Sequence, residues 1–600
     1  MALERKDIDK KYKWDLSAIY ESVDAFNADY KIAEGKIAEF KKHEKTFTSS
    51  AKALYDALTD MTVIERAIER LWSYASLNFS TDTSNNTYQA LTGKVRSLAV
   101  SCDSAAWFIK PYLLRLDEKT VEGWFAELPE LETFRRMIEK TMREKKHTLS
   151  DDCEKLMSAL GDCLGSHDNI RSIFANSDMK FGKIKTEDGK RVELTDATYG
   201  IYLRSGERRV RMAAFKEMYK TYGQFANTFA TLLDGRIREA TTLAKTNNFK
   251  DSLTASTFKD EITPEIYNNL IKTVESSLEP LYDYYELKRE VLGLDKLHLY
   301  DIYTPLVGSL AREYSYEEAV EDVLAATEIF GEEYHSTLKA GLKEKGWVDV
   351  YPTKGKRGGA FSAGCPETEP YILLNYNGRY DDVSTLAHEA GHSMHTWFST
   401  HYNEPHNSSY RIFVAEVAST VNELLLAHRK LAECKSDEEK LYILDGLMET
   451  YKATLYRQTM FASFEKQMHA RIEKGETLTA DSVNKAYYKL VKKYFGKDVV
   501  CDKQIALEWA RIPHFYSCFY VYKYATCISA ASAIVKRIEE EGASYVGKYI
   551  DFLKCGDSKS PLDSLLVAGI DMRDPAVVSD AIQDFTSSVR QFREIYNKNK

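Results

Sequence analysis

The five residues His388-Glu-Ala-Gly-His392 constrain this chain more than any other stretch of its sequence. They match the pattern H-E-x-x-H, and residues four apart on an α-helix project from the same face. Two neutral imidazoles placed in this way can bind one Zn²⁺, while Glu389 lies close enough to reach a water activated by the metal. The alternative is a solvated helix that carries two unrelated histidines.

The residues around the motif favour the metal interpretation. Apolar side chains recur along the same stretch and predict a helix that is largely buried. They are Val383, Leu386, Ala390, Met394 and Trp397. Buried imidazoles and carboxylates need partners, and a metal ion is a good one. Gly391 is a poor helix residue, and it predicts close approach by another backbone or by a substrate, or else loose packing.

A zinc hydrolase needs a third protein ligand and one open position for water. Residues 399–410 read as a loop, and a second helix then begins near Tyr410. If the two helices are antiparallel, Glu416 faces the two histidines from an apolar stretch. Glu423, two turns later, is the competing ligand. We prefer it as a carboxylate that accepts an imidazole N–H, and the alternative is an ordinary exposed glutamate.

Several longer stretches resemble the oligoendopeptidase F group of the thimet oligopeptidase family. They include LAHEAGHSMHTWFS, FVAEVASTVNE, KRGGAFSAGC and WARIPHFYSCFYVYKYAT, and the resemblance runs from about residue 170 towards the C-terminus. It implies zinc ligands at His388, His392 and Glu416 and a general base at Glu389. Ala390 stands where the family usually carries a larger apolar residue.

A second cluster of candidate residues lies in the C-terminal part of the chain, after Pro513. In the family, a histidine and tyrosines of this segment stabilise the oxyanion that forms during peptide hydrolysis. The resemblance therefore implies such a role for His514 and Tyr522, and also for Tyr516. The spacing here is shorter than in thimet oligopeptidase, and many of the 39 tyrosines must serve only for packing.

The predicted fold is mostly α-helical. Helical periodicity dominates the sequence, and Glu187-Asp-Gly-Lys190 predicts a β-hairpin close to the domain boundary. We expect an N-terminal helical domain over residues 1–195 and a catalytic domain over 196–600, with a small β element at residues 350–380 just before the zinc helix. The resemblance implies the two-part architecture of thimet oligopeptidase and neurolysin, with a deep substrate channel that admits short unfolded peptides.

Composition excludes some classes of protein. The formal net charge of −9 argues against a general nucleic-acid binder, and no stretch approaches the length of a membrane span. No signal peptide is visible, and the nine scattered cysteines are typical of free thiols in a reducing cytoplasm. The oligomeric state stays open.

Together these observations predict a cytoplasmic zinc endopeptidase, with one Zn²⁺ per chain, that hydrolyses short peptides. Two alternatives stay open. One is a zinc amidase of other specificity that uses the same ligands. The other is a helical peptide-binding protein with a structural metal, which is disfavoured because structural zinc sites usually have four protein ligands, often cysteines.

Overall fold

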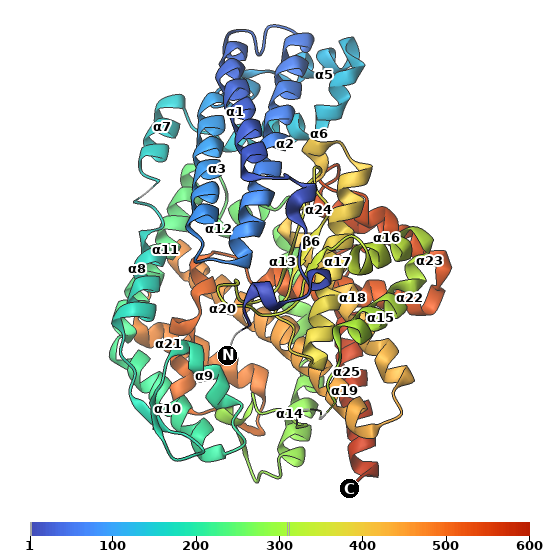
Figure 1. Cartoon of the computed structure of the whole chain (residues 1–600). Coiled ribbons are helices and arrows are strands. Elements are labelled where there is room, and N and C mark those ends of the chain that lie inside the picture. The colour runs from blue at the N-terminus through green and yellow to red at the C-terminus, as the bar shows by residue number, and fades with distance from the viewer. Residues whose placement is uncertain (1–2, 162, 309, 311) are drawn as a thin grey trace. The chain divides into compact units, whose positions relative to one another are not determined.

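Helices make up most of this chain, and the few strands are two or three residues long (Figure 1). The structure is a computed structural model that describes residues 3–161, 163–308, 310 and 312–600. It confirms the prediction of a mostly α-helical fold with a small β element next to the helix of the H-E-x-x-H motif.

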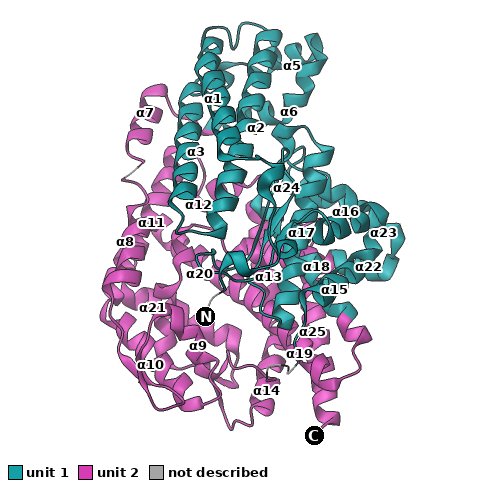
Figure 2. Ribbon diagram, viewed as in Figure 1, with its two compact units in different colours: residues 1–146, 312–429, 534–570 teal, residues 147–311, 430–533, 571–600 magenta. Residues whose placement is uncertain are grey.

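The chain divides into two compact units, each built from three segments of sequence (Figure 2). Unit 1 contains residues 1–146, 312–429 and 534–570, and unit 2 contains residues 147–311, 430–533 and 571–600. The predicted domain boundary between residues 1–195 and 196–600 is sequential, and it stays a prediction.

Unit 1 begins with a bundle of three long helices, α1 (Val23–Phe40), α2 (Ala51–Thr81) and α3 (Asn86–Ala105). An apolar stripe along α2 is buried at Leu54, Leu58, Ile64 and Leu71. The remaining helices of the unit are α4 (Ile109–Arg115), α5 (Glu118–Glu127), α6 (Arg135–Met142), α15 (Tyr316–Thr327), α16 (Glu332–Lys343), α17 (Tyr380–Tyr402), α18 (Ile412–Glu433), α23 (Ala543–Leu553) and α24 (Pro561–Val567).

A three-stranded sheet lies beside α17 in unit 1. Its order is β4 (Val348–Asp349), β6 (Tyr371–Leu373) and β5 (Phe361–Ala363), so β6 is central and β5 forms an edge. The β5–β6 pair is antiparallel, and the β4–β6 pair is parallel. Ser362 of β5 contacts Ser393 of α17 through their hydroxyl oxygens at 2.9 Å, which ties the edge strand to the helix of the motif.

Unit 2 is also helical, and it contains the predicted hairpin. Its strands β1 (Lys183–Lys185) and β2 (Arg191–Glu193) pair antiparallel across a turn in which Gly189 has a φ of +82°. The helices are α7 (Asp151–Ala159), α8 (Ser166–Ile173), α9 (Asp196–Leu203), α10 (Arg208–Gln224), α11 (Ala226–Thr246), α12 (Ser252–Lys259), α13 (Pro264–Glu275), α14 (Glu279–Val291), α19 (Asp437–Tyr451), α20 (Arg457–Glu473), α21 (Ala480–Phe495) and α25 (Pro575–Lys598). A further pair of strands, β3 (Leu297–His298) and β7 (Val499–Val500), is parallel.

Helix α22 (Tyr522–Glu541) begins in unit 2 and ends in unit 1. Each of the nine cysteines is a free thiol. Every described helix is too short or too polar to traverse a lipid bilayer.

Candidate metal centre

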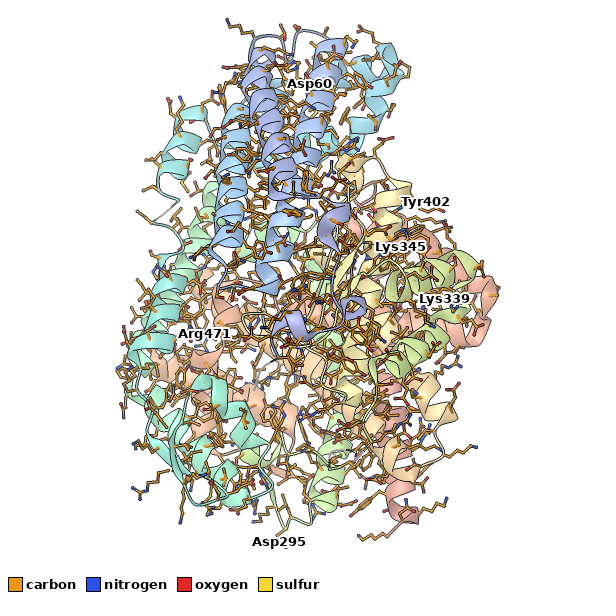
Figure 3. All side chains as sticks on the ribbon, in the orientation of Figure 1. Asp60, Asp295, Lys339, Lys345, Tyr402 and Arg471 are labelled. Atoms are coloured by element: carbon orange, nitrogen blue, oxygen red, sulfur yellow. The ribbon has the colours of Figure 1, made fainter. Side chains whose placement is uncertain are left out.

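Helix α17 carries the H-E-x-x-H motif and begins directly after a turn. Gly378 of this turn has a φ of +81°, a left-handed conformation that suits glycine. The carboxylate of Asp382 then accepts hydrogen bonds from the backbone N–H groups of Asn377 and Arg379, and so caps the start of the helix. The helix ends at Tyr402, which Figure 3 labels, so its last turn occupies residues 399–402 that the sequence assigned to the loop.

Helices α17 and α18 pack closely at Gly391. A Cβ atom on this glycine would lie 2.5 Å from the carbonyl oxygen of Ala418 and 2.6 Å from the Cα of Ser419. Only glycine permits such a distance, which confirms the predicted close approach of another backbone. The buried amide of Asn422 adds a cross-link, because it donates a hydrogen bond to the carbonyl oxygen of Ala387.

This packing brings the three predicted metal ligands together. The Nε2 atoms of His388 and His392 are 3.2 Å apart, and the Oε2 atom of Glu416 lies 3.4 Å from the first and 3.3 Å from the second. These three form the cluster of potential metal-binding side chains found among the described residues. Their side chains keep between 18% and 35% of their accessible surface, so a metal and a small molecule can reach them.

The geometry suits zinc. In a tetrahedral site with bonds of about 2.0–2.1 Å, neighbouring ligand atoms are roughly 3.3 Å apart, which matches all three separations. Two nitrogens and one carboxylate oxygen are also a usual donor set for a zinc site that keeps one position open.

The electrostatics favour a cation at this place. Burial acts to lower the pKa of His388, but the hydrogen bond and negative charge of Glu423 outweigh it and raise that pKa to about 9. Burial acts to raise the pKa of Glu416, but the imidazole of His392 outweighs it and lowers that pKa to about 2. The site thus attracts positive charge, and a divalent metal would compete with the imidazole proton for it.

Glu423 lies on the other side of His388 from the candidate metal position. Its Oε1 atom is 2.9 Å from Nδ1 of His388, a distance at which the carboxylate accepts the Nδ1–H. That hydrogen bond fixes one proton on Nδ1, so Nε2, directed towards Glu416, is the nitrogen that a metal would bind after displacing its proton. This is the arrangement that the sequence favoured for Glu423 over direct metal binding.

Glu389 is buried beside this cluster, with 5% of its surface exposed. Burial raises the pKa of its carboxyl group, and its Oε2 atom has no hydrogen-bond partner within the described part of the chain. A buried carboxylate oxygen without a partner can take up a proton from a nearby donor.

His395 and His401, which follow the motif, do not join the cluster. His395 is 1% exposed and stacks on Tyr410 at 3.8 Å between ring centroids, and burial lowers its pKa to about 3. His401 is exposed and stacks on Trp397. Both are therefore packing or surface residues.

The second predicted cluster belongs to unit 2, around the 3₁₀ turn Pro513–Tyr516. His514 is exposed, and its ring centroid lies 6.2 Å from those of Tyr520 and Tyr524. Tyr522, by contrast, is fully buried and donates a hydrogen bond to Asp260 at 3.2 Å. Tyr516 is also buried, with 4% of its surface exposed. The accessible aromatic neighbours of His514 are therefore Tyr520 and Tyr524.

Sequence reasoning missed the residue that holds this loop. Phe519 has a φ of +57°, and its N–H donates a hydrogen bond of 2.6 Å to Oε1 of Glu465. Glu465 is 2% exposed, and its Oε2 has no partner in the ranges that the structure describes. Burial raises its pKa to about 8. The available signal was Glu465 and His469, two titratable residues one helical turn apart in an apolar stretch.

Comparison with known proteins identifies the family of this chain. A family model described as peptidase family M3 matches residues 201–584, and one described as oligopeptidase F matches residues 113–181. Oligopeptidase PepF of Bacillus subtilis (strain 168) is 39% identical over 597 residues, which cover 100% of this chain and 89% of the relative.

Solved structures show the same similarity. Oligoendopeptidase-F from Enterococcus faecium matches with a TM-score of 0.74 and 32% identity, over 96% of this chain and 99% of that one. A crystal structure named as a peptidase, from Chlamydophila abortus, matches with a TM-score of 0.92 and 32% identity, over 99% and 100% of the two chains. The chain therefore belongs to peptidase family M3, in its oligoendopeptidase F group, and is a metalloendopeptidase.

Proposed function

We propose that this protein is a zinc-dependent endopeptidase that hydrolyses internal bonds of short peptides. The observation that carries the proposal is the convergence of His388, His392 and Glu416, whose ligand atoms lie 3.2–3.4 Å apart. The proposed stoichiometry is one Zn²⁺ per chain, because these three residues form one cluster.

In the proposed mechanism, Glu389 is the general base. A bound zinc ion would act as a Lewis acid that lowers the pKa of water and polarises the scissile carbonyl. Glu389 takes the proton of the attacking water and passes it to the leaving amine. Its buried, unpartnered Oε2 and its raised pKa support both transfers, because a carboxylate of raised pKa is a stronger base.

The proposed role of Glu423 is to orient His388. Its carboxylate holds the Nδ1 proton, which keeps Nε2 available as a ligand.

We further propose that the edge of β5 holds the substrate in an extended conformation. An edge strand presents unpaired backbone groups, and a peptide can add to it through main-chain hydrogen bonds without regard to sequence. The deep channel implied by the family resemblance stays a prediction.

The proposed oxyanion donor from unit 2 is His514. Partial desolvation of the ring and the positive charge of Arg171 lower the pKa of its imidazole, so a neutral N–H is available near pH 7. The resemblance implies Tyr522 or Tyr516 as its partner, but both are buried, and the hydroxyl of Tyr522 already bonds Asp260. Tyr520 and Tyr524, which lie beside His514, are the competing candidates.

A cytoplasmic location is part of the proposal, and it is supported by nine free thiols. A zinc amidase and a non-catalytic peptide binder stay as alternatives.

The direct test is digestion of a peptide mixture by metal-replete protein, with products read by mass spectrometry. We expect internal cleavage of short peptides, its loss on treatment with a chelator, and its return when zinc is added. Cleavage of small amides alone would support an amidase. Metal-dependent binding of peptides without cleavage would support a binding protein.

A further inference from the structure

Unit 2 contains a cavity of about 290 Å³ that none of the proposed catalytic groups lines. Its walls come from α9, α10, α20, the end of α21 and the 3₁₀ helix Lys503–Arg511. The volume is near the lower end of the range for small-molecule sites. Apolar side chains line part of it, among them Phe215, Leu299, Phe495 and Ile505.

Three arginines, Arg204, Arg457 and Arg511, and two carboxylates lie in the wall, and each oxygen of the carboxylates already accepts a hydrogen bond. Glu508 accepts from Nη2 of Arg457 at 2.7 Å with one oxygen and from the hydroxyl of Tyr487 at 2.5 Å with the other. Asp196 accepts from Nε of Arg511 at 3.0 Å and, with its other oxygen, from Tyr222 at 2.5 Å.

The guanidinium groups of Arg457 and Arg511, in contrast, keep N–H donors to spare. A guanidinium carries five N–H donors, and among the described residues each of these two groups gives one bond to a carboxylate. Their side chains retain 20% and 18% of their accessible surface, and both residues line the cavity. Both positive charges act on Glu508, so Arg457 and Arg511 border the same carboxylate. The cavity is therefore lined by two guanidinium groups that have N–H donors to spare.

A third donor comes from Tyr303, which also lines the cavity. Burial raises the pKa of its hydroxyl, so the group stays protonated. No described residue forms a hydrogen bond with that hydroxyl, although Lys452 lies 4.8 Å from the ring centroid.

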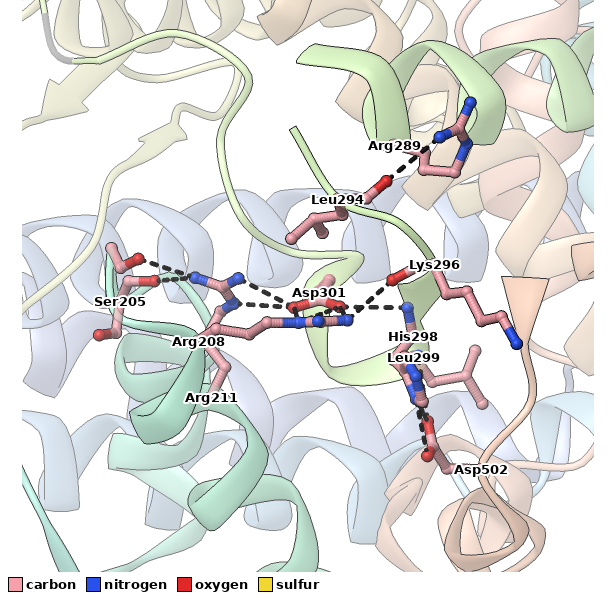
Figure 4. Close-up of polar contacts among 11 residues, drawn as sticks. Ser205, Arg208, Arg211, Arg289, Leu294, Lys296, His298, Leu299, Asp301 and Asp502 are labelled. Atoms are coloured by element: carbon pink, nitrogen blue, oxygen red, sulfur yellow. Dashed lines mark hydrogen bonds and ion pairs between the residues drawn. The ribbon is translucent and has the colours of Figure 1, made fainter. Parts of the chain in front are cut away.

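The wall that carries Tyr303 is held rigidly (Figure 4). Asp301 is completely buried and accepts hydrogen bonds from the guanidinium groups of both Arg208 and Arg211, as the dashed lines in the figure show. It also accepts from the N–H of His298. These bonds fix the turn at residues 299–303, from which Leu299 and Tyr303 reach the cavity. A cavity with fixed walls is suited to binding, because few side chains lose conformational freedom when a ligand enters.

We propose that this cavity binds a small organic carboxylate with an apolar body, of the size of an amino acid. Arg457, Arg511 and Tyr303 donate hydrogen bonds to the carboxylate, and Phe215 and Phe495 contact the apolar part. Guanidinium groups match the planar carboxylate well. An inorganic anion would leave the apolar wall without a partner. The site lies apart in sequence from the metal ligands, and the proposal does not depend on zinc catalysis.

The test is calorimetric titration of the full-length, metal-replete protein with N-acetyl-leucine and with N-acetyl-leucinamide. The two probes differ only in the carboxylate, so the acid should bind at least about tenfold more tightly, which is the effect of roughly one charge-assisted hydrogen bond. The same titration after chelation should give the same affinity, because the metal ligands line no part of this cavity.

Two variants of α9 localise the binding. Ala197 is exposed and lines the cavity, so Ala197→Trp should block its mouth and abolish binding of the acid. Ile201 is 66% exposed on the same helix and does not line the cavity, so Ile201→Trp should bind normally. Tyr303→Phe should weaken the binding of N-acetyl-leucine and leave the affinity for N-acetyl-leucinamide unchanged.

Equal affinity for acid and amide would overturn the proposal, and so would the absence of binding at millimolar concentration. Binding of N-acetyl-leucine that is lost on chelation but survives Ala197→Trp would show that its carboxylate binds at the metal centre. That result would also overturn the proposal. None of these three results bears on peptide cleavage, which is measured separately.

Discussion

The α17–α18 pair and the loop around His514 differ in how their candidate residues are held. In the helix pair, His388, His392 and Glu416 are positioned by two long helices in contact at Gly391. In the loop, His514 follows a short 3₁₀ turn, and Phe519 adopts a left-handed conformation that a buried carboxyl group stabilises. Residues held on long helices can therefore be identified from their helical spacing. The positions of residues in the loop depend on contacts with residues distant in sequence.

The largest effect is expected for Glu389→Gln. The amide keeps the shape of the side chain but cannot accept the proton of the attacking water, so kcat should fall by about 10²–10⁴-fold. Zinc content, measured by atomic emission, should be unchanged, because Glu389 is not among the three clustered ligands. Turnover at the wild-type rate would show that Glu389 is not the general base. The helix pair would then lack its proposed catalytic residue.

A smaller effect should separate the two glutamates of α18. Glu416→Ala removes a proposed ligand, so zinc binding should weaken and fall below one ion per chain. Glu423→Ala removes a hydrogen bond to His388, which typically weakens metal affinity or activity by about 10–100-fold. At saturating zinc this second variant should still bind one ion. The reverse pattern in a zinc titration would exchange the two roles.

Much of the candidate metal centre was predictable because its information is local. Four-residue spacing places His388 and His392 on one face, and an apolar context around Glu416 indicates a buried carboxylate that needs a partner. The helical fold and the hairpin at residues 187–190 follow from the same short-range patterns.

The remaining features were not predictable, because they depend on contacts between distant residues. Residues 399–402 carry loop-like composition, yet they continue α17. The bond from Tyr522 to Asp260 joins residues 262 positions apart, and that from Phe519 to Glu465 joins residues 54 apart. Both bonds decide which side chains of the loop are accessible, and no periodicity in a single sequence encodes them.

The stability of the loop should depend on Glu465. Glu465→Ala leaves the buried N–H of Phe519 without an acceptor, which costs about 1–3 kcal/mol. Glu465→Gln keeps an acceptor oxygen and should cost less. Chemical denaturation of both variants measures the difference, and a larger loss in Glu465→Gln would contradict this assignment.

The same carboxyl group should make stability depend on pH. Its pKa is about 8 in the folded protein and 4.5 ordinarily, so the folded state holds more protons between these values, and stability falls as pH rises. His469 has a folded pKa of about 3 and an ordinary value of 6.5, and its titration acts equally on the wild type and on Glu465→Gln, so it cancels in the difference between them. From pH 6.5 to 8 the wild type should lose on the order of 2 kcal/mol relative to Glu465→Gln. If the stability of the wild type and that of Glu465→Gln changed equally with pH, Glu465 would have an ordinary pKa.

The smallest effect on catalysis is expected for Tyr522→Phe, although the sequence singled out this tyrosine. Its hydroxyl is buried and bonded to Asp260, so its removal should lower stability and leave kcat unchanged within error. Removing a hydroxyl that does stabilise the oxyanion costs about 10²–10³ in kcat. Tyr520→Phe, which changes an accessible neighbour of His514, is the matched comparison. A large loss of kcat in Tyr522→Phe alone would mean that its bond to Asp260 breaks when substrate binds, and that the loop rearranges while the helix pair does not.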